Sequence, residues 1–185
     1  IGTSRAGEEL DNAYDQVFYE ALTAADIGHR KEADVGRGML TEMIQQVHQE
    51  LRQEGIEYPE VDIVEIWRRA LHVLQERGVV DAASIPEDAL QKLAVEYVVR
   101  NNPVWPMPGA LETLEALRDS GIVLGVVSNA QFFTPELFHA LLDREMDELG
   151  FDARLRIYSY EHRCAKPGTQ LYQLAEQELS QLGIS

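Results

Sequence analysis

Apolar residues recur at three- and four-residue steps through the first hundred positions, which is the pattern of helices that each bury one face. No alternating or continuous apolar run typical of a strand interrupts them. The fourth stretch opens at Ser84, whose hydroxyl can cap the helix, with Pro86 in the first turn, where no hydrogen-bond donor is missed. The predicted helices cover about residues 8–25, 35–51, 60–77 and 84–98.

The pattern changes after Arg100. Three prolines and a glycine crowd residues 101–109, which favours an extended linker. Beyond it, helices and strands alternate, as expected for a parallel sheet with crossover helices. One strand, Ile122 to Val127, is apolar at every position except Gly125 and predicts burial on both faces of the sheet. The predicted order is helix 109–120, strand 122–127, helix 134–149, strand 155–159 and helix 168–182.

Candidate site residues follow the two predicted strands. Ser128 and Asn129 come directly after the first strand, and Lys166 lies in the loop between the second strand and the last helix. Ligands of parallel sheets bind beyond the carboxyl ends of the strands, so these residues are expected to meet at one edge. Two hydrogen-bond donors and one positive charge suit a phosphoryl group or another anion.

Charge and composition disfavour some classes of binding partner and indicate a location. The formal net charge of −16 opposes binding to nucleic acid or to an anionic membrane surface. No apolar run is long enough to cross a bilayer, and the first residues do not form a secretory signal. The single cysteine, Cys164, suits a reducing compartment, so a cytoplasmic location is expected. Lysine occurs only at positions 31, 92 and 166, which makes Lys166 at a motif position more notable.

In these features the sequence resembles the haloacid dehalogenase-like (HAD) hydrolase superfamily. S-N after an apolar strand is similar to its second motif, and A-K-P about forty residues later is similar to its third. The preceding P-x-P-G-x-x-x-x-L-x-x-L-R adds to the resemblance. The resemblance implies an α/β fold, with a Rossmann-like parallel-sheet core that is incomplete in this chain and an inserted all-helical cap domain. It implies a loop from core to cap at 1–7, the cap at 8–100 and the partial core at 101–185.

The resemblance also implies an activity. It suggests a Mg²⁺-dependent phosphatase that acts on a small phosphorylated metabolite through an aspartyl-phosphate intermediate. Ser128 and Asn129 would then bind the phosphoryl group, and Lys166 would offset the negative charge of that group and of the nucleophile. The sequence has neither the D-x-D motif that carries the nucleophile nor the acidic fourth motif that holds Mg²⁺. We expect both to lie outside this sequence, and the chain as written to be inactive.

Two alternatives remain open. A haloacid dehalogenase-type hydrolase would need a cap arginine that holds a carboxylate, and none can be identified. A non-catalytic HAD-like binding or interaction protein would keep the fold without the nucleophile and present its acidic surface to a basic partner. Oligomeric state cannot be read from the sequence.

Individual residues have simpler interpretations beside the functional ones. Ser128 could simply be a hydroxyl that satisfies backbone groups at a strand end, and Asn129 could simply form a turn, as asparagine commonly does. Cys164 is expected to be a partly buried small side chain, and the spacing of the histidines indicates no metal site. Helix packing for the aromatic side chains and solvation for the charged ones is favoured over substrate contact at five cap positions: Tyr14, Phe18, His29, Arg30 and Arg37.

Overall fold

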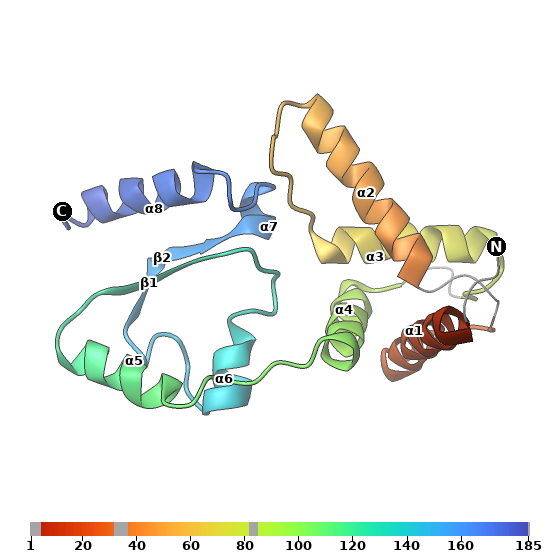
Figure 1. Ribbon diagram of the computed structural model, residues 1–185, viewed down its shortest axis with the longest axis horizontal. Coiled ribbons are helices and arrows are strands. Elements are labelled where there is room, and N and C mark those ends of the chain that lie inside the picture. Colours follow the sequence, from red (N-terminus) through yellow and green to blue (C-terminus); the bar gives the residue numbers. More distant parts are fainter. Residues whose placement is uncertain (1–4, 32–36, 82–84, 185) are drawn as a thin grey trace. The chain divides into compact units, whose positions relative to one another are not determined.

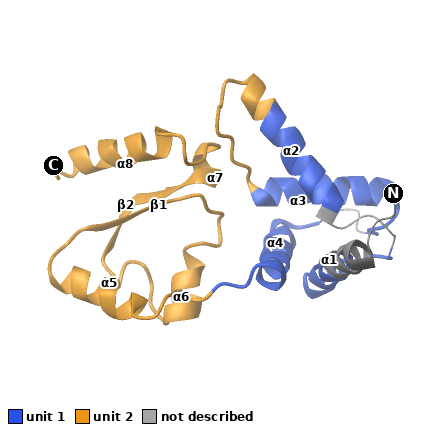
Figure 2. Ribbon diagram, in the orientation of Figure 1, with its two compact units in different colours: residues 1–49, 63–104 blue, residues 50–62, 105–185 orange. Residues whose placement is uncertain are grey.

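The computed structural model describes the backbone of residues 5–31, 37–81 and 85–184, and the side chains of these residues except 5–14 and 37. Within those ranges the chain contains eight helices and a two-stranded parallel sheet, so helices and strands are mixed as in α/β proteins (Figure 1). The chain divides into two compact units (Figure 2). Unit 1 comprises residues 1–49 and 63–104, and unit 2 comprises residues 50–62 and 105–185.

Unit 1 is helical, as the apolar periodicity predicts. Its core is aromatic: Trp67 and Phe18 are fully buried, with ring centroids 5.6 Å apart, and Tyr97 meets Trp67 at 5.2 Å. The helices are α1 (Arg5–Ala24), α2 (Arg37–Gln53, whose last residues fall in unit 2), α3 (Ile63–Glu76) and α4 (Glu87–Asn101). Helix α4 packs against both α1 and α3, and these contacts bury the apolar face of each helix.

Two helix starts differ from the prediction. Helix α1 begins at Arg5, so residues 5–7, predicted as a loop, are helical. Helix α4 begins at Glu87, and Pro86 is its extended N-cap residue, with φ −70° and ψ 156°, instead of a member of its first turn. Ser84, the predicted cap, lies outside the described residues.

Unit 2 contains the sheet, in which β1 (Leu124–Ser128) pairs in parallel with β2 (Phe151–Tyr158). Alternate β1 residues point to opposite sides, as the pleat requires. Leu124 and Val126 pack into a cluster with side chains of α5 (Ala110–Asp119) and α6 (Glu136–Leu142), whereas Val127 packs into a cluster that includes Leu171 of α8 (Gln170–Gln181). The short helix α7 (Ser159–His162) follows β2 directly.

Three predictions for unit 2 differ from the structure, and one of them concerns the second strand, which was expected at 155–159 but begins at Phe151 and ends at Tyr158. The first strand is only half-buried, and Ile122 and Val123, just before it, are 48% and 50% exposed. The helix predicted for 134–149 ends at Leu142, because Asp143 adopts a left-handed φ of 53° that stops the α-helix.

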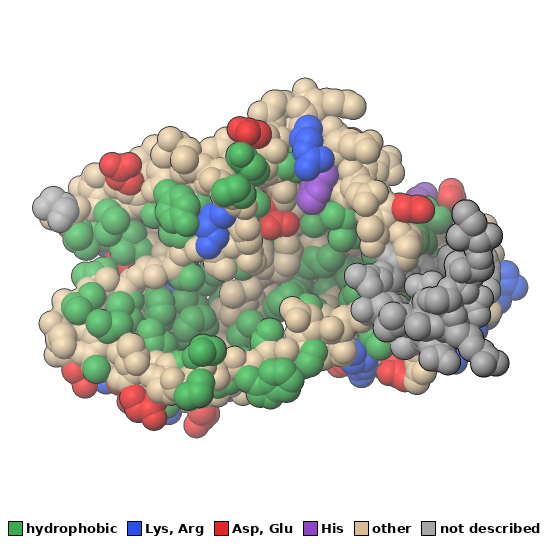
Figure 3. All heavy atoms as spheres, in the orientation of Figure 1, with side chains coloured by type: hydrophobic (Ala, Val, Ile, Leu, Met, Phe, Trp, Pro, Cys, Tyr) green, Lys and Arg blue, Asp and Glu red, His purple; other side chains and the backbone are tan. Residues whose placement is uncertain are grey.

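Apolar side chains reach the surface of unit 2 in Figure 3, and Trp105 and Met107 are among the most exposed.

The division of the chain also differs from the predicted boundaries. Residues 50–62, predicted within a helical cap that runs from 8 to 100, group with the sheet-containing unit instead. The change to the second unit at residue 105 lies close to the predicted boundary at 101. Among the described helices, none combines the length and apolar character needed to cross a membrane.

Candidate anion site

The parallel pairing brings the loops after the two strands to the same edge of the sheet. Ser128, the last residue of β1, lies beside Tyr158, the last residue of β2. The chain then continues from β1 into Asn129 and from β2, through α7, into the loop that carries Lys166. The structure therefore brings together the three residues that the sequence predicts to meet.

Asn129 and Lys166 are joined by a reciprocal pair of hydrogen bonds. The Asn129 side chain donates from Nδ2 to the Lys166 carbonyl at 3.1 Å, and its Oδ1 accepts the Lys166 backbone N–H at 2.8 Å. Both ends of the amide thus bind the backbone of the other loop. This geometry makes Asn129 a clamp for Lys166, whereas its direct contact with a phosphoryl group stays a prediction.

The charged end of Lys166 turns toward β1. Its Nζ donates to the Val127 carbonyl at 2.8 Å, which uses one of the three donors of an ammonium group. The Ser128 hydroxyl lies 3.5 Å from the Asn129 carbonyl, a distance at which a hydrogen bond contributes little. The carboxyl end of β1 therefore carries a hydroxyl and an ammonium group that can both donate to a bound anion.

Segment 56–62, which the sequence analysis did not connect with the site, lies along the Lys166 loop. It pairs antiparallel with residues 163–165: the Ala165 N–H donates to the Tyr58 carbonyl at 2.8 Å, and the Glu60 N–H to the Arg163 carbonyl at 3.1 Å. A Cβ built on Gly168 would lie 3.1 Å from Cδ2 of Tyr58, so the ring packs directly on that glycine. The Lys166 loop is thus held by Asn129 and by segment 56–62.

Ser159 is the main residue that sequence reasoning missed. It is fully buried, and its hydroxyl bonds the Ala130 backbone and the Glu60 carboxylate. The only signal in the sequence was its place at the end of a predicted strand. Its partner Glu60 lies 99 residues away, at the start of a predicted helix that in fact begins at Ile63.

Titration of nearby groups follows from burial. Burial raises the pKa of the Cys164 thiol, so this side chain is protonated at neutral pH. Burial, followed by the negative charge of Glu161, raises the pKa of Tyr160 to about 12. Burial also raises the pKa of Tyr158, with an opposing effect from Arg156. These phenols therefore remain neutral donors at physiological pH.

Carboxylate side chains are not clustered among the residues that the structure describes. Mg²⁺ prefers carboxylate and other oxygen ligands, and no group of three or more His, Cys, Asp or Glu side chains comes together in the part of the chain that is described. Near the anion site, both carboxylate oxygens of Glu60 already accept hydrogen bonds, from Val61 and from Ser159.

Three of the five positions considered for substrate contact in the predicted cap have described side chains, and each of these makes contacts inside unit 1. Phe18 is fully buried, which confirms helix packing, and the His29 ring stacks on Tyr19 with centroids 5.3 Å apart. Arg30 donates to the Arg77 carbonyl at 3.1 Å. The side chains of Tyr14 and Arg37 lie outside the described residues.

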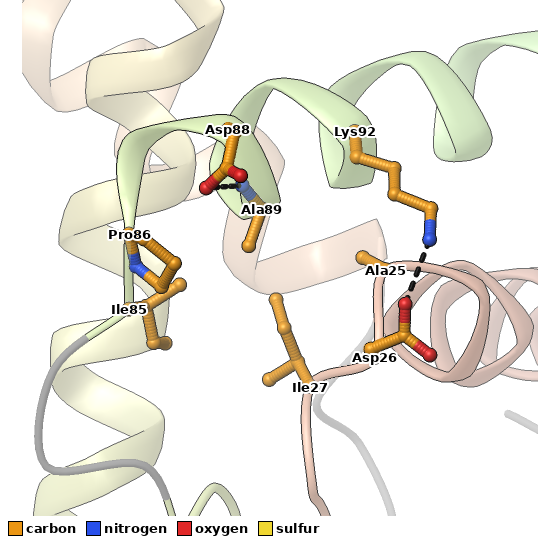
Figure 4. Close-up of a pocket in the computed structure, with 8 residues that line it drawn as sticks. All are labelled: Ala25, Asp26, Ile27, Ile85, Pro86, Asp88, Ala89 and Lys92. Carbon is orange, nitrogen blue, oxygen red and sulfur yellow. Dashed lines mark hydrogen bonds and ion pairs between the residues drawn. The ribbon is translucent and has the colours of Figure 1, made fainter.

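Unit 1 also contains a pocket of about 370 Å³ (Figure 4). Lys92 of α4 faces Asp26 across it, and their charged atoms lie 2.8 Å apart. The positive charge in the pocket is thus already paired, and the pocket offers an anion much less than the end of β1 does. The lining residues are Ala25, Asp26, Ile27, Ile85, Pro86, Asp88, Ala89 and Lys92.

Comparison with known proteins gives no family for the chain. No protein-family model, no curated protein and no solved structure matches it. The interpretation of the site therefore depends on the sequence motifs and on the geometry described above.

Proposed function

We propose that the protein is a HAD-like hydrolase of the phosphatase type that acts on a small phosphorylated metabolite. The observation that carries the proposal is the position of the Lys166 ammonium, 2.8 Å from the carbonyl of Val127 and thus next to Ser128. Phosphoryl transfer places negative charge on the phosphoryl oxygens, and catalysis depends on donors already arranged to meet that charge.

In this proposal each residue has a distinct role. The Ser128 hydroxyl donates a hydrogen bond to a phosphoryl oxygen, and the Lys166 ammonium offsets the charge of the phosphoryl group and of the attacking carboxylate. Asn129 keeps the Lys166 backbone against the end of β1. The attacking aspartate and the ligands of Mg²⁺ would have to come from segments outside this sequence, which contains no D-x-D motif.

The proposal is tested with the protein expressed from its complete gene. We expect Mg²⁺-dependent hydrolysis of an aryl phosphate, and a loss of kcat of about 100-fold or more in Lys166→Ala, the usual effect of removing one group that stabilises transition-state charge. Lys92→Ala is the matched control: Lys92 is exposed and paired with Asp26 in unit 1, so kcat should stay unchanged.

Other results would identify the alternatives. Release of halide from a 2-haloacid, without phosphate release, would show a dehalogenase. Absence of turnover with both substrate types would contradict the proposal and favour a non-catalytic binding protein. Equal activity of Lys166→Ala and the wild type would also contradict it.

A further inference from the structure

The buried hydroxyl of Ser159 connects the loop after β1 to segment 56–62. Its oxygen accepts the Ala130 backbone N–H at 2.9 Å. The hydroxyl proton has two acceptors within reach, Glu60 Oε2 at 2.8 Å and the Ala130 carbonyl at 3.3 Å. It is directed to Glu60, because hydrogen bonds to a carboxylate are shorter and stronger than those to a neutral carbonyl.

Glu60 continues the connection. Its second oxygen, Oε1, accepts the Val61 N–H at 2.9 Å, so both carboxylate oxygens are bonded. The Gln131 side chain donates from Nε2 to the Val61 carbonyl at 2.8 Å. Ala130 and Gln131 are therefore connected to Glu60 and Val61, so the loop that follows Ser128 is held by contacts additional to those between Asn129 and Lys166.

We infer that Ser159 and Glu60 are positioning residues that fix the backbone of 128–130 and thereby the direction of the Ser128 hydroxyl. This inference rests on the proposed function, because it gives Ser128 a role at the phosphoryl group. Ala130 is only two residues from Ser128, and Ser128 itself has no strong hydrogen bond of its own to orient it. The orientation of its hydroxyl thus depends on how firmly the next residues are held.

Burial of Ser159 makes the loss of its hydrogen bond with the Ala130 N–H costly. Ser159 is 0% exposed, so the Ala130 N–H loses a buried acceptor when the hydroxyl is removed. Alanine would fill nearly the same volume as Ser159, so packing alone does not require a serine. The hydroxyl adds the hydrogen bonds that connect the loop after β1 to segment 56–62.

The first test compares Ser159→Ala and Ser128→Ala, alone and combined, in the protein expressed from its complete gene, with an aryl phosphate as substrate. We expect Ser159→Ala to lower kcat about tenfold with little change in KM, because misplacing a donor weakens transition-state contacts more than binding. In the Ser128→Ala background the same change should have almost no further effect. Fully additive losses would overturn the inference, because Ser159 would then act independently of Ser128.

Further variants separate positioning from general destabilisation. Ser159→Thr keeps the hydroxyl and should restore most of kcat. Glu60→Gln has one carbonyl oxygen for two donors, so its kcat should lie between those of the wild type and Ser159→Ala. Ser180→Ala removes an exposed serine that bonds Glu176 within α8, and its kcat should equal that of the wild type. Equal kcat values for Ser159→Ala and Ser180→Ala would overturn the inference.

Amide hydrogen exchange gives a result that does not require turnover. The Ala130 amide should exchange about tenfold faster in Ser159→Ala than in the wild type, measured by NMR, because it loses the Ser159 hydroxyl oxygen as its acceptor. If no variant hydrolyses a phosphate but Ala130 exchange rises, the proposed function fails while the positioning of the loop is supported. Unchanged exchange at Ala130 would overturn the positioning itself.

Discussion

Replacing Gly125 by alanine is expected to weaken the pairing of β1 with β2. A Cβ at this position would lie 2.8 Å from Cβ and 3.1 Å from the carbonyl oxygen of Leu155, where ordinary contacts begin at 3.4 Å. Both obstructing atoms belong to or adjoin the backbone of a buried β2 residue, so they cannot rotate away. The strands must separate locally, in a region where the register already shifts between Leu124 and Val126.

Overpacking of this kind costs about 1–3 kcal/mol. With a urea dependence of about 1–3 kcal/mol per molar for a protein of this class, the unfolding midpoint should fall by about 1 M. The assay is urea unfolding followed by circular dichroism. The control is Gly38→Ala: Gly38 lies in α2 with nothing within 4 Å of an added Cβ, so its midpoint should stay the same or rise. Equal midpoints for Gly125→Ala and the wild type would refute the close approach of the strands.

Three further predictions concern the site and its surroundings. Asn129→Ala removes both bonds to Lys166 and should speed exchange of the Lys166 amide about fivefold by NMR; unchanged exchange would contradict the clamp. Leu171→Ala empties a fully buried position under β1 and should lower the free energy of unfolding by about 2–5 kcal/mol in urea, whereas a loss below about 1 kcal/mol would contradict that burial. The Tyr160 phenol, with its pKa raised to about 12, keeps its proton after an unfolded tyrosine has lost it at about 10, so the folded state binds more protons and stability should fall from pH 10 to 12. Tyr160→Phe should flatten that decline in a pH series of urea unfolding curves, and an identical decline in both proteins would contradict the shift.

Local patterns in the sequence predicted the elements well, because they depend on neighbours in the chain. The change from helices alone to alternating helices and strands near residue 101 is confirmed by the structure. The sequence also predicted that Ser128, Asn129 and Lys166 meet, since parallel strands bring their carboxyl ends to one edge of the sheet. The early end of α6 was not predicted, because the residue that ends it in a left-handed conformation is Asp143, and neither glycine nor proline signals the end in the sequence.

Contacts between distant segments could not be predicted in this way. Glu60 sits in a stretch with helical composition, and only the fold shows that it is extended and bonded to Ser159. The half-exposure of β1 likewise depends on which elements cover it, and an apolar run cannot show that. The contacts of Asn129 could not be predicted for the same reason: its side-chain amide bonds the backbone of Lys166, which lies 37 residues away in the sequence.

The central claim is that Ser128 and Lys166 form one anion-binding site, and a titration with inorganic phosphate followed by amide NMR tests it most directly. The account predicts that the amides of residues 128–130 and 166 shift together in the wild type and in Lys92→Ala, and that these shifts disappear in Lys166→Ala. Shifts confined to other residues, or shifts that persist in Lys166→Ala, would contradict it.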